Sequence, residues 1–302
     1  MEIIEKRAFD FLGKRKIAFV ISGILSIVGL IAALAIPLGR ANLGTDFSGG
    51  VAVQLRFEKP FSIEEARKML EKGGLPDAAL QEFAGTTRLL VRVRRSRDLG
   101  GVADSVGGVF RKDMPDNPFT VDSTTEVGPT VGKKLQRDAL WAVIISLAGI
   151  LVYVAWRFEF RFGVAAVAAT FHDVLAILGV LFILNKEITL LIITALLTLA
   201  GYSLTDTVVV FDRIRENMRK HTKEDFTALM NRSINEVFGR TMVTSGTTLL
   251  SLFALLIIGG DVIFDFALAL FLGVVVGTYS SIFVASPLLL LWKGKKVKTG
   301  KK

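Results

Sequence analysis

The chain has 302 residues, of which 51% are hydrophobic, and its mean hydropathy is +0.52. This composition is typical of an integral membrane protein with one soluble insert. The absence of cysteine excludes disulfides and thiolate metal sites, and the two histidines, His172 and His221, are too scattered for a histidine metal centre. The net charge of +9 lies mostly beside apolar runs, the pattern that orients membrane proteins, and it therefore argues against nucleic-acid binding.

The first apolar run covers about residues 17–38 and follows the basic cluster Lys14–Lys16. Ala33 and Ala35 resemble the cleavage site of a signal peptide. The run is nevertheless long enough to cross a membrane, which takes about 20 residues, and further runs follow it. We predict an uncleaved first membrane helix with a cytoplasmic N-terminus.

The following soluble stretch, residues 39–134, alternates strand and helix patterns. Apolar residues recur at every second position over 51–57, as in a half-buried strand. Ser62 and Glu65 have the spacing of a capping box before an amphipathic helix. Strands are predicted near 80–83, 89–94 and 119–127, with a glycine-rich helix over about 99–110 between the last two. The order βαββαβ predicts a small α+β domain of the ferredoxin-like type.

Five further apolar runs predict an α-helical membrane protein with six transmembrane helices. Basic loops after the second and fourth helices, and a basic tail, place both termini in the cytoplasm and the soluble domain outside it. The predicted segments are 1–16 cytoplasmic, 17–38 helix one, 39–134 extracytoplasmic domain, 135–156 helix two, 162–184 helix three, 188–211 helix four, 212–239 cytoplasmic connector, 240–258 helix five, 262–292 helix six and 293–302 tail.

The connector between the fourth and fifth helices carries its own helical pattern. Thr222 and Asp225 resemble an N-terminal cap, and apolar residues from Phe226 to Phe238 lie at amphipathic spacing. Two interpretations remain open, a helix lying on the inner membrane surface and a plain helical connector.

The fourth helix carries a carboxylate, Asp206, before its apolar run has ended. An aspartate at bilayer depth costs about 2.5–3.5 kcal/mol on insertion scales, so its presence indicates either an ion or proton site or a polar link between helices. Arg240, at the start of the fifth helix, is the expected partner, and Thr244 lies one turn further on the same face. Only the carboxylate of this pair can carry a proton, because arginine keeps its proton in proteins.

A second acidic residue, Asp173, lies beside His172 in the third helix, near mid-bilayer. It is either part of a proton relay or a polar residue satisfied by a neighbouring helix.

The sixth helix contains small residues at every fourth position: Gly273, Gly277, Ser281 and Ala285. Such a stripe predicts close helix packing, and we predict that either this face or the amphipathic helix of the connector forms part of a subunit contact.

Two glycine-rich stretches in the soluble part carry no chemistry by themselves. The stretch 127–134 fails as a phosphate loop, since its glycine spacing is short and Lys134 stands where serine or threonine is required. Residues 44–50 form the pattern of a turn with a capping Asp. No nucleophile–base pattern is present, so we expect no enzymatic activity, no cofactor and no metal.

Several motifs together resemble the SecF family of protein-export membrane proteins, in the resistance-nodulation-division superfamily. They are G-T-D-F-S-G-G at 44–50, V-G-P-T-V-G at 127–132, R-F-E-F-R-F-G at 157–163, His172-Asp173, G-Y-S-L-T-D-T-V-V-V-F-D-R-I-R-E-N at 201–217, R-T-M-V-T-S-G-T-T-L-L at 240–250 and G-T-Y-S-S-I-F-V-A-S-P at 277–287.

The resemblance implies a bacterial inner-membrane protein with a periplasmic domain, a SecD partner and association with the SecYEG channel. It further implies that the proton-motive force assists translocation and release of unfolded exported polypeptides, with Asp206 and Arg240, and less firmly Thr244, as proton residues. Two alternatives are a small-solute or drug–proton antiporter of the same superfamily and a membrane scaffold without ion coupling.

Overall fold

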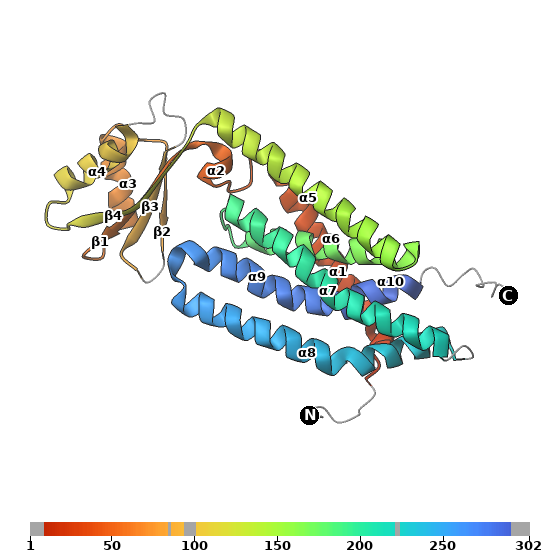
Figure 1. Ribbon diagram of the computed structural model, residues 1–302. Helices are drawn as coiled ribbons and strands as arrows, with labels where there is room; N and C mark the ends of the chain where they lie inside the picture. The colour runs from red at the N-terminus through yellow and green to blue at the C-terminus, as the bar shows by residue number, and fades with distance from the viewer. Residues whose placement is uncertain (1–8, 84–85, 94–100, 221–223, 291–302) are drawn as a thin grey trace. The chain divides into compact units, whose positions relative to one another are not determined.

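The computed structural model describes residues 9–83, 86–93, 101–220 and 224–290 (Figure 1). It divides into two compact units. One comprises residues 1–42, 141–186 and 191–302, and the other comprises residues 43–140 together with the short segment 187–190. We call them the helical unit and the small unit.

Six helices in the described part of the chain are long and apolar enough to cross a membrane. They are α1 (Arg15–Ala35), α5 (Pro129–Arg157), α6 (Phe160–Ile183), α7 (Leu190–Lys220), α8 (Phe226–Ile258) and α9 (Gly260–Ser280), the last extended by α10 (Ser286–Leu290). The predicted number of membrane helices is therefore confirmed.

The helical unit is centred on α6 and α9. Helix α1 packs against α6, and α9 packs against both α6 and α8. Large apolar side chains of α1, α5 and α8 stay exposed, among them Ile24, Ile145 and Leu250. Continuous exposed apolar surface of this kind is typical of contact with lipid or another membrane chain.

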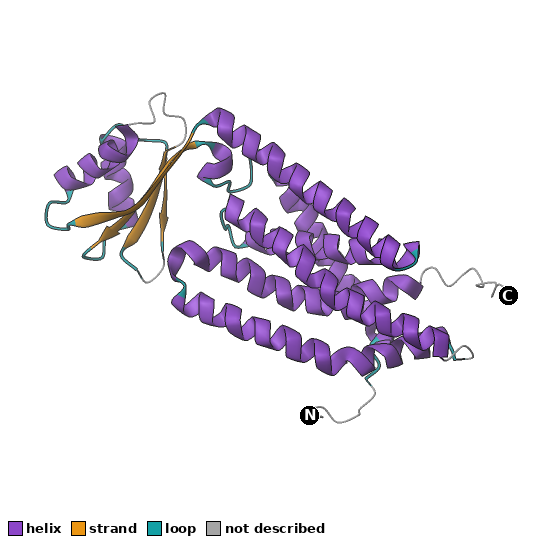
Figure 2. Cartoon of the chain, viewed as in Figure 1, coloured by secondary structure: helices purple, strands orange, loops and turns teal. Residues whose placement is uncertain are grey.

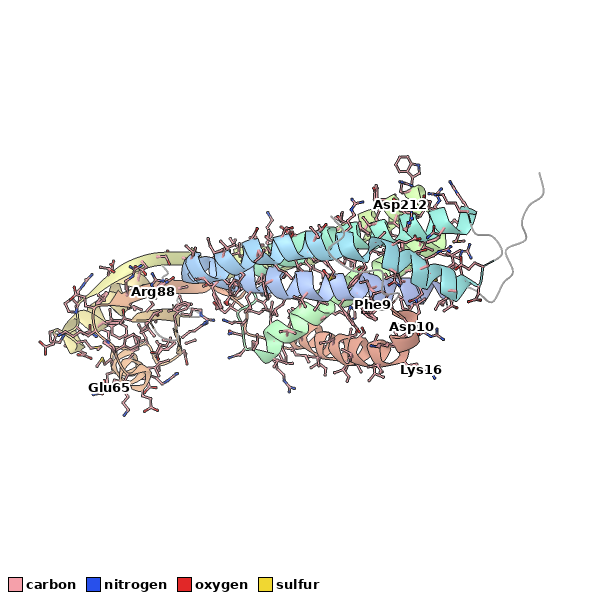
Figure 3. All side chains as sticks on the ribbon, turned by 90° about the horizontal axis from the view of Figure 1, so that it is seen from below. Phe9, Asp10, Lys16, Glu65, Arg88 and Asp212 are labelled. Carbon is pink, nitrogen blue, oxygen red and sulfur yellow. The ribbon has the colours of Figure 1, made fainter. Side chains whose placement is uncertain are left out.

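The chain before α1 is attached to α8 by asparagine side chains. Asn235 exchanges two hydrogen bonds of 2.9 Å with the backbone of Phe9, which is labelled in Figure 3, and Asn231 accepts one of 2.9 Å from the backbone N–H of Phe11. Phe11 and Leu12 are buried in the same apolar cluster as Leu229 and Ile234 of α8.

Helix α7 continues past residue 211, the predicted end of the fourth span. Helix α8 begins at Phe226, well before residue 240, the predicted start of the fifth span. The connector over 212–239 is therefore no separate surface helix. Its described residues form the last turns of α7 and the first turns of α8. The sequence offers no proline inside either helix to stop it. The predicted cap at Asp225 is confirmed, because its carboxylate accepts hydrogen bonds from the N–H groups of Thr227 and Ala228, whereas Thr222 lies outside the described residues.

The sequence predicts one helix for the sixth span. In the structure a π-helical segment, Ser281–Ala285, lies between α9 and α10. The hydroxyl of Ser286 donates to the carbonyl of Ser281, five residues earlier, at 2.9 Å. Such wide turns are often found at functional sites. The predicted end of this span at residue 292 and the basic tail lie outside the described residues.

The small unit is a four-stranded antiparallel sheet with two helices on one face (Figure 2). Its elements follow the order β1 (Gly50–Phe57), α3 (Ile63–Lys72), β2 (Ala78–Glu82), β3 (Arg88–Val93), α4 (Val102–Asp113) and β4 (Phe119–Val127), with the spatial order β2-β3-β1-β4. This arrangement confirms the predicted ferredoxin-like βαββαβ fold.

The core of the small unit lies between the sheet and the two helices. Val53, Leu55 and Leu89 from the sheet pack against Leu70 of α3 and Phe110 of α4. Their spacing of two in strands and of three or four in helices is what places them on one side.

One local prediction in the small unit is wrong. Ser62 is the residue before α3, but its side chain makes no capping hydrogen bond, so no capping box forms with Glu65. Strand β4 forms as predicted, and as an edge strand of the sheet it is exposed along its middle.

Candidate functional site

The buried carboxylate Asp173 joins three helices of the helical unit. It is fully buried on α6 and accepts a hydrogen bond of 2.7 Å from the hydroxyl of Ser280 on α9. A second hydroxyl, that of Ser203 on α7, donates to the same carboxylate oxygen. Buried polar groups of this kind are stable only when hydrogen-bonded, which explains why hydroxyl residues occur at both positions inside apolar helices.

The imidazole of His172 lies against the other oxygen of this carboxylate. Its Nδ1 is 2.9 Å from Asp173 Oδ1, although adjacent helical residues point in different directions. The ring is buried, and its Nε2 has no hydrogen-bond partner among the described residues. One nitrogen is thus engaged by the carboxylate, while the other remains available to accept or donate a proton.

The second carboxylate, Asp206, has a different environment. It is buried on α7 and accepts a hydrogen bond of 3.3 Å from Ser245 of α8. The Ser245 hydroxyl is in turn 2.7 Å from the hydroxyl of Thr278 on α9. Asp206 therefore has one long hydrogen bond within the described part of the chain, whereas Asp173 has three partners.

Helices α7 and α9 contribute residues to the surroundings of both carboxylates. Ser203 and Asp206 lie three residues apart on α7, which places them on neighbouring turns of one face. On α9, Thr278 contacts the hydroxyl of Ser245, the donor to Asp206, while Ser280, two residues further on, donates to Asp173. We call the two carboxylates and these four hydroxyl residues the polar cluster of the helical unit. Its members are Asp173, Ser203, Asp206, Ser245, Thr278 and Ser280.

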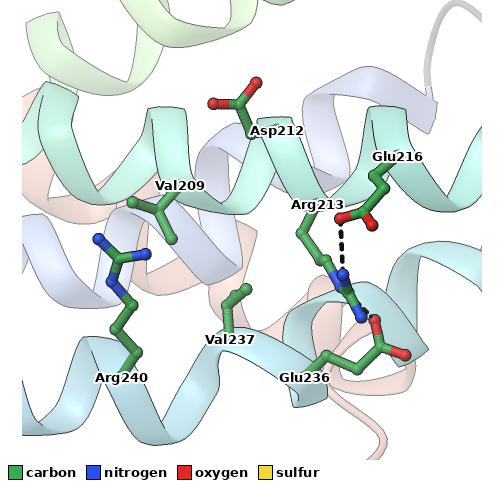
Figure 4. Close-up of a pocket in the computed structure, with 7 residues that line it drawn as sticks. All are labelled: Val209, Asp212, Arg213, Glu216, Glu236, Val237 and Arg240. Carbon is green, nitrogen blue, oxygen red and sulfur yellow. Dashed lines mark hydrogen bonds and ion pairs between the residues drawn. The ribbon is translucent and has the colours of Figure 1, made fainter.

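Arg240 does not form an ion pair with Asp206 or with another described residue. Its side chain is exposed on α8 and lines a pocket of about 470 Å³ between α7 and α8 (Figure 4). On α8 it lies five residues before Ser245, the hydrogen-bond donor of Asp206. In the same pocket Arg213 is held by Glu216 and Glu236, each at 2.6 Å.

Thr244 lies outside the polar cluster. It is exposed, and its hydroxyl donates to the carbonyl of Arg240, one turn earlier on its own helix, at 3.0 Å. The residue of this segment that reaches Asp206 is instead its neighbour Ser245.

The small residues of the sixth span lie against α7. A β-carbon at Gly273 would come within 2.7 Å of Leu199, and one at Gly277 within 3.1 Å of Ser203. Ser281 and Ala285 are fully buried. Gly277 thus allows the close approach that lets both Ser203 and Ser280 reach the carboxylate of Asp173.

Sequence reasoning identified both carboxylates but missed most of their partners. Ser245, Thr278 and Ser280 were not singled out, although hydroxyl residues recur within the apolar runs at 244–248 and 277–281. Hydroxyl groups inside a membrane helix usually bond to their own backbone, so the sequence does not reveal which of them turn toward a carboxylate.

The described residues contain no group of three or more His, Cys, Asp and Glu side chains able to hold a metal ion. The arrangement suits proton binding, because a buried carboxyl group changes its charge when its surroundings change. Fold and site together define a multi-pass membrane protein with buried carboxylates between its helices and a ferredoxin-like domain inserted after the first span.

Comparison with known proteins identifies the family. The family described as "Protein export membrane protein SecD/SecF, C-terminal" matches residues 110–295. Proteins named "Protein translocase subunit SecF" from Thermodesulfovibrio yellowstonii and Calditerrivibrio nitroreducens are 50% and 41% identical to this chain; the alignments cover 96% and 97% of this chain, and 97% of each relative. The chain belongs to the SecD/SecF family of protein-export membrane proteins, among its SecF members.

Solved structures agree with this assignment. The crystal structure of SecDF from Thermus thermophilus, described as a translocon-associated membrane protein, matches 96% of this chain with a TM-score of 0.86 and 38% identity. A second SecDF structure, in a super-membrane-facing form, matches with a TM-score of 0.69. The present chain spans 39% of the length of the first of these longer chains.

Proposed function

We propose that this chain is an accessory subunit of the protein-export machinery that uses the proton-motive force, with Asp206 as the proton carrier. The observation that carries the proposal is the environment of Asp206: a buried carboxylate in a membrane helix with one long hydrogen bond and no ion pair among the described residues. A carboxylate held this loosely gains and loses a proton more readily than one held by several strong partners.

Asp173 and His172 supply a second part of the proposed pathway. Ser203 and Asp206 share one face of α7, so a change at either carboxylate acts on the same helix. His172 Nε2, which has no hydrogen-bond partner among the described residues, gives this relay a nitrogen that can accept or donate a proton.

Arg240 acts as a fixed positive charge near the carrier. Moving one charge through 100 mV releases about 2.3 kcal/mol, which is sufficient to bias a conformational equilibrium. Because Arg240 keeps its charge, a helix movement that changes its distance from Asp206 favours either the ionised or the protonated carboxyl group.

The partners follow from the family. SecF and SecDF relatives are named as translocase subunits and as translocon-associated, and the present chain corresponds to part of the SecDF chain. We infer that it assembles with SecD and works beside the SecYEG channel in the bacterial inner membrane. We infer that its termini lie in the cytoplasm and its small unit in the periplasm, and that it assists translocation and release of unfolded exported polypeptides there.

The test replaces Asp206 with asparagine, which keeps the shape and the hydrogen bonding but carries no proton at neutral pH. Export is measured in vesicles that contain the assembled complex, with and without a proton gradient. We expect Asp206→Asn to assemble normally and to lose the gradient-dependent part of export. Export that remains fully gradient-stimulated means that the carboxylate is a structural link in a scaffold, or that coupling lies elsewhere.

Thr205→Ala is the matched control, because Thr205 is the preceding residue of α7 but is exposed and bonds to its own helix. We expect this variant to keep gradient stimulation. An antiporter would show itself differently, by resistance to a toxic solute that depends on the presence of the protein.

A further inference from the structure

Two buried hydroxyl groups of the helical unit have no hydrogen-bond partner among the described residues. They belong to Thr207 of α7 and Thr241 of α8, which are 1% and 2% exposed. Leaving a buried hydroxyl group without a partner is costly, so such groups nearly always bind protein atoms or ordered water. These two threonines therefore indicate a binding site for a small polar molecule.

Other hydroxyl residues of the same two helices bond to their own backbone. Thr205 and Thr244 each donate to the carbonyl four residues earlier, at 3.2 and 3.0 Å. This bond is within reach of any threonine in a helix interior. Neither Thr207 nor Thr241 makes it to a described residue, so both hydroxyl groups are left to bind a partner outside their own helices.

Helices α7 and α8 run antiparallel in this part of the helical unit. Asp206 of α7 meets Ser245 of α8, whereas Arg213, later in α7, meets Glu236, earlier in α8. A step forward along α7 and a step backward along α8 therefore lead in the same direction. Both lead from the polar cluster toward the pocket that Arg213 and Glu236 line (Figure 4).

The two threonines each lie one such step from the polar cluster. Thr207 follows Ser203 by four residues on α7, and Thr241 precedes Ser245 by four residues on α8. Residues four apart share one face of a helix and lie about 6 Å apart along its axis. Thr207 and Thr241 are thus both displaced from the polar cluster toward the pocket.

A third hydroxyl residue, Ser281, lies at the same level. Two successive glycines of the sixth-span stripe approach Leu199 and then Ser203 of α7, so α7 and α9 run parallel. Four residues further along the two helices are Thr207 and Ser281, which the same register places side by side. We call Thr207, Thr241 and Ser281 the second polar layer.

The hydroxyl oxygen of Ser281 is able to accept a hydrogen bond. The residue is fully buried, and its hydroxyl group donates to the carbonyl of Thr278 at 3.0 Å, which leaves the lone pairs of the oxygen. Ser281 also begins the π-helical segment, a feature that is frequent at functional sites. The second polar layer therefore offers two hydroxyl donors and at least one acceptor.

The pocket lies within one turn of the second polar layer. Val209 follows Thr207 by two residues, Val237 precedes Thr241 by four, and both valines line the pocket (Figure 4). Its volume of about 470 Å³ has room for several water molecules, each of which occupies about 30 Å³ in the liquid. The second polar layer thus has the polar cluster on one side and space for water on the other.

We propose that Thr207, Thr241 and Ser281 bind a buried water molecule that connects Asp206 with the pocket lined by Arg240. A buried water molecule needs two to four polar partners, and the second polar layer supplies three. The bound water accepts the proton that the carboxyl group of Asp206 releases and passes one proton to water in the pocket. The reverse sequence returns a proton to the carboxylate. The transport role rests on the proposed function, whereas the water site does not.

The first experiment locates the water molecule. The assembled complex is imaged at a resolution that shows buried water. We expect an ordered water molecule within hydrogen-bond distance of at least two of the three hydroxyl groups of the second polar layer. Absence of such a water molecule overturns the proposal.

The second experiment removes single hydroxyl groups by Thr207→Val and Thr241→Val. Valine matches the shape of threonine, so it raises stability where the hydroxyl group is unbound and lowers stability where that group binds water. We expect the thermal unfolding midpoint of the detergent-purified protein to fall by roughly 2–4 °C in each variant. An unchanged or higher midpoint in either variant overturns the proposal.

Two exposed threonines of the same helices provide the controls. Thr198 of α7 and Thr247 of α8 bond to their own backbone. We expect Thr198→Val and Thr247→Val to change the midpoint by roughly 1 °C or less. A fall as large as that of the buried variants means that the loss is common to all threonines of these helices, which contradicts a water site.

Gradient-dependent export in vesicles with the assembled complex tests the transport role. We expect Thr207→Val and Thr241→Val to lower it severalfold, and Thr207→Ser and Thr241→Ser to keep most of it, because serine retains the hydroxyl group. A role in packing alone predicts the reverse order, since serine leaves a cavity that valine fills. Valine variants that export as well as the serine variants contradict the transport role.

Asp206→Asn is measured in the same vesicles to separate the two proposals. If Asp206→Asn loses gradient stimulation and both valine variants keep it, the water link alone fails. If Asp206→Asn keeps gradient stimulation, the proposed proton role fails. The imaging and the unfolding midpoints then decide the water site, because neither depends on proton transfer.

Discussion

Single hydroxyl groups determine how the two carboxylates differ. Asp173 is held by Ser203, Ser280 and His172, whereas Asp206 is reached by Ser245 over 3.3 Å. A hydrogen bond to a charged group is worth about 1.5–3 kcal/mol, roughly twice a neutral one. The structure thus combines one firmly bound carboxylate on α6 with one loosely bound carboxylate on α7.

Ser280 is expected to contribute strongly to stability. We predict that Ser280→Ala lowers the free energy of unfolding by about 1.5–3 kcal/mol, because it removes a buried donor to a carboxylate. Thermal unfolding of the detergent-purified protein measures the change. Ser251→Ala is the control, because Ser251 is exposed and donates to its own helix; we expect a change below about 0.5 kcal/mol. Equal small changes in both variants contradict the assigned role of the Ser280 hydroxyl.

Among the elements, α1 and α6 approach each other closely at two glycines. A β-carbon at Gly29 would lie 2.1 Å from the carbonyl oxygen of Leu175, and one at Gly179 would lie 2.8 Å from the backbone nitrogen of Gly29. The sequence directed attention to the small-residue stripe of the sixth span, because that stripe repeats. One isolated glycine on each of two helices forms no repeat, so this contact was not predictable from the sequence.

This contact provides a test at the level of one element. Gly29→Ala is expected to destabilise the protein by about 1–3 kcal/mol, because the added methyl group forces α1 away from α6. Gly23→Ala lies in the same helix with no atom within 4 Å of the added carbon. We expect it to be neutral or slightly stabilising, since alanine favours helix more than glycine does. Thermal unfolding of both variants checks the difference, and similar values contradict the packing assigned to Gly29.

For the whole molecule, the parts predicted well are those governed by periodicity. Six apolar runs and the βαββαβ order follow from the spacing of apolar residues and are found in the structure. The parts predicted poorly depend on contacts between distant segments. Asp46 was expected to cap a turn, but it caps α7, which begins 144 residues later. Likewise, periodicity gives no sign that residues 187–190 belong to the small unit.

The orientation of the chain is a separate prediction. Loop charges place the small unit outside the cytoplasm and the basic tail inside it. Because the chain lacks cysteine, single variants Asp77→Cys and Thr299→Cys can be labelled without background. We expect a membrane-impermeant thiol reagent to label position 77 in spheroplasts, and position 299 only after the membrane is opened. Labelling of position 299 in intact spheroplasts contradicts the orientation.

The uninterrupted length of α7 has a mechanical consequence. Its 31 residues extend about 46 Å, well beyond the roughly 30 Å of a bilayer's hydrocarbon core. A straight rod of that length, tilted by about 10°, shifts one end by about 8 Å relative to the other. Asp206 lies about halfway along the helix, so a small angular change beside the carboxylate becomes a displacement of several ångströms at either end of α7.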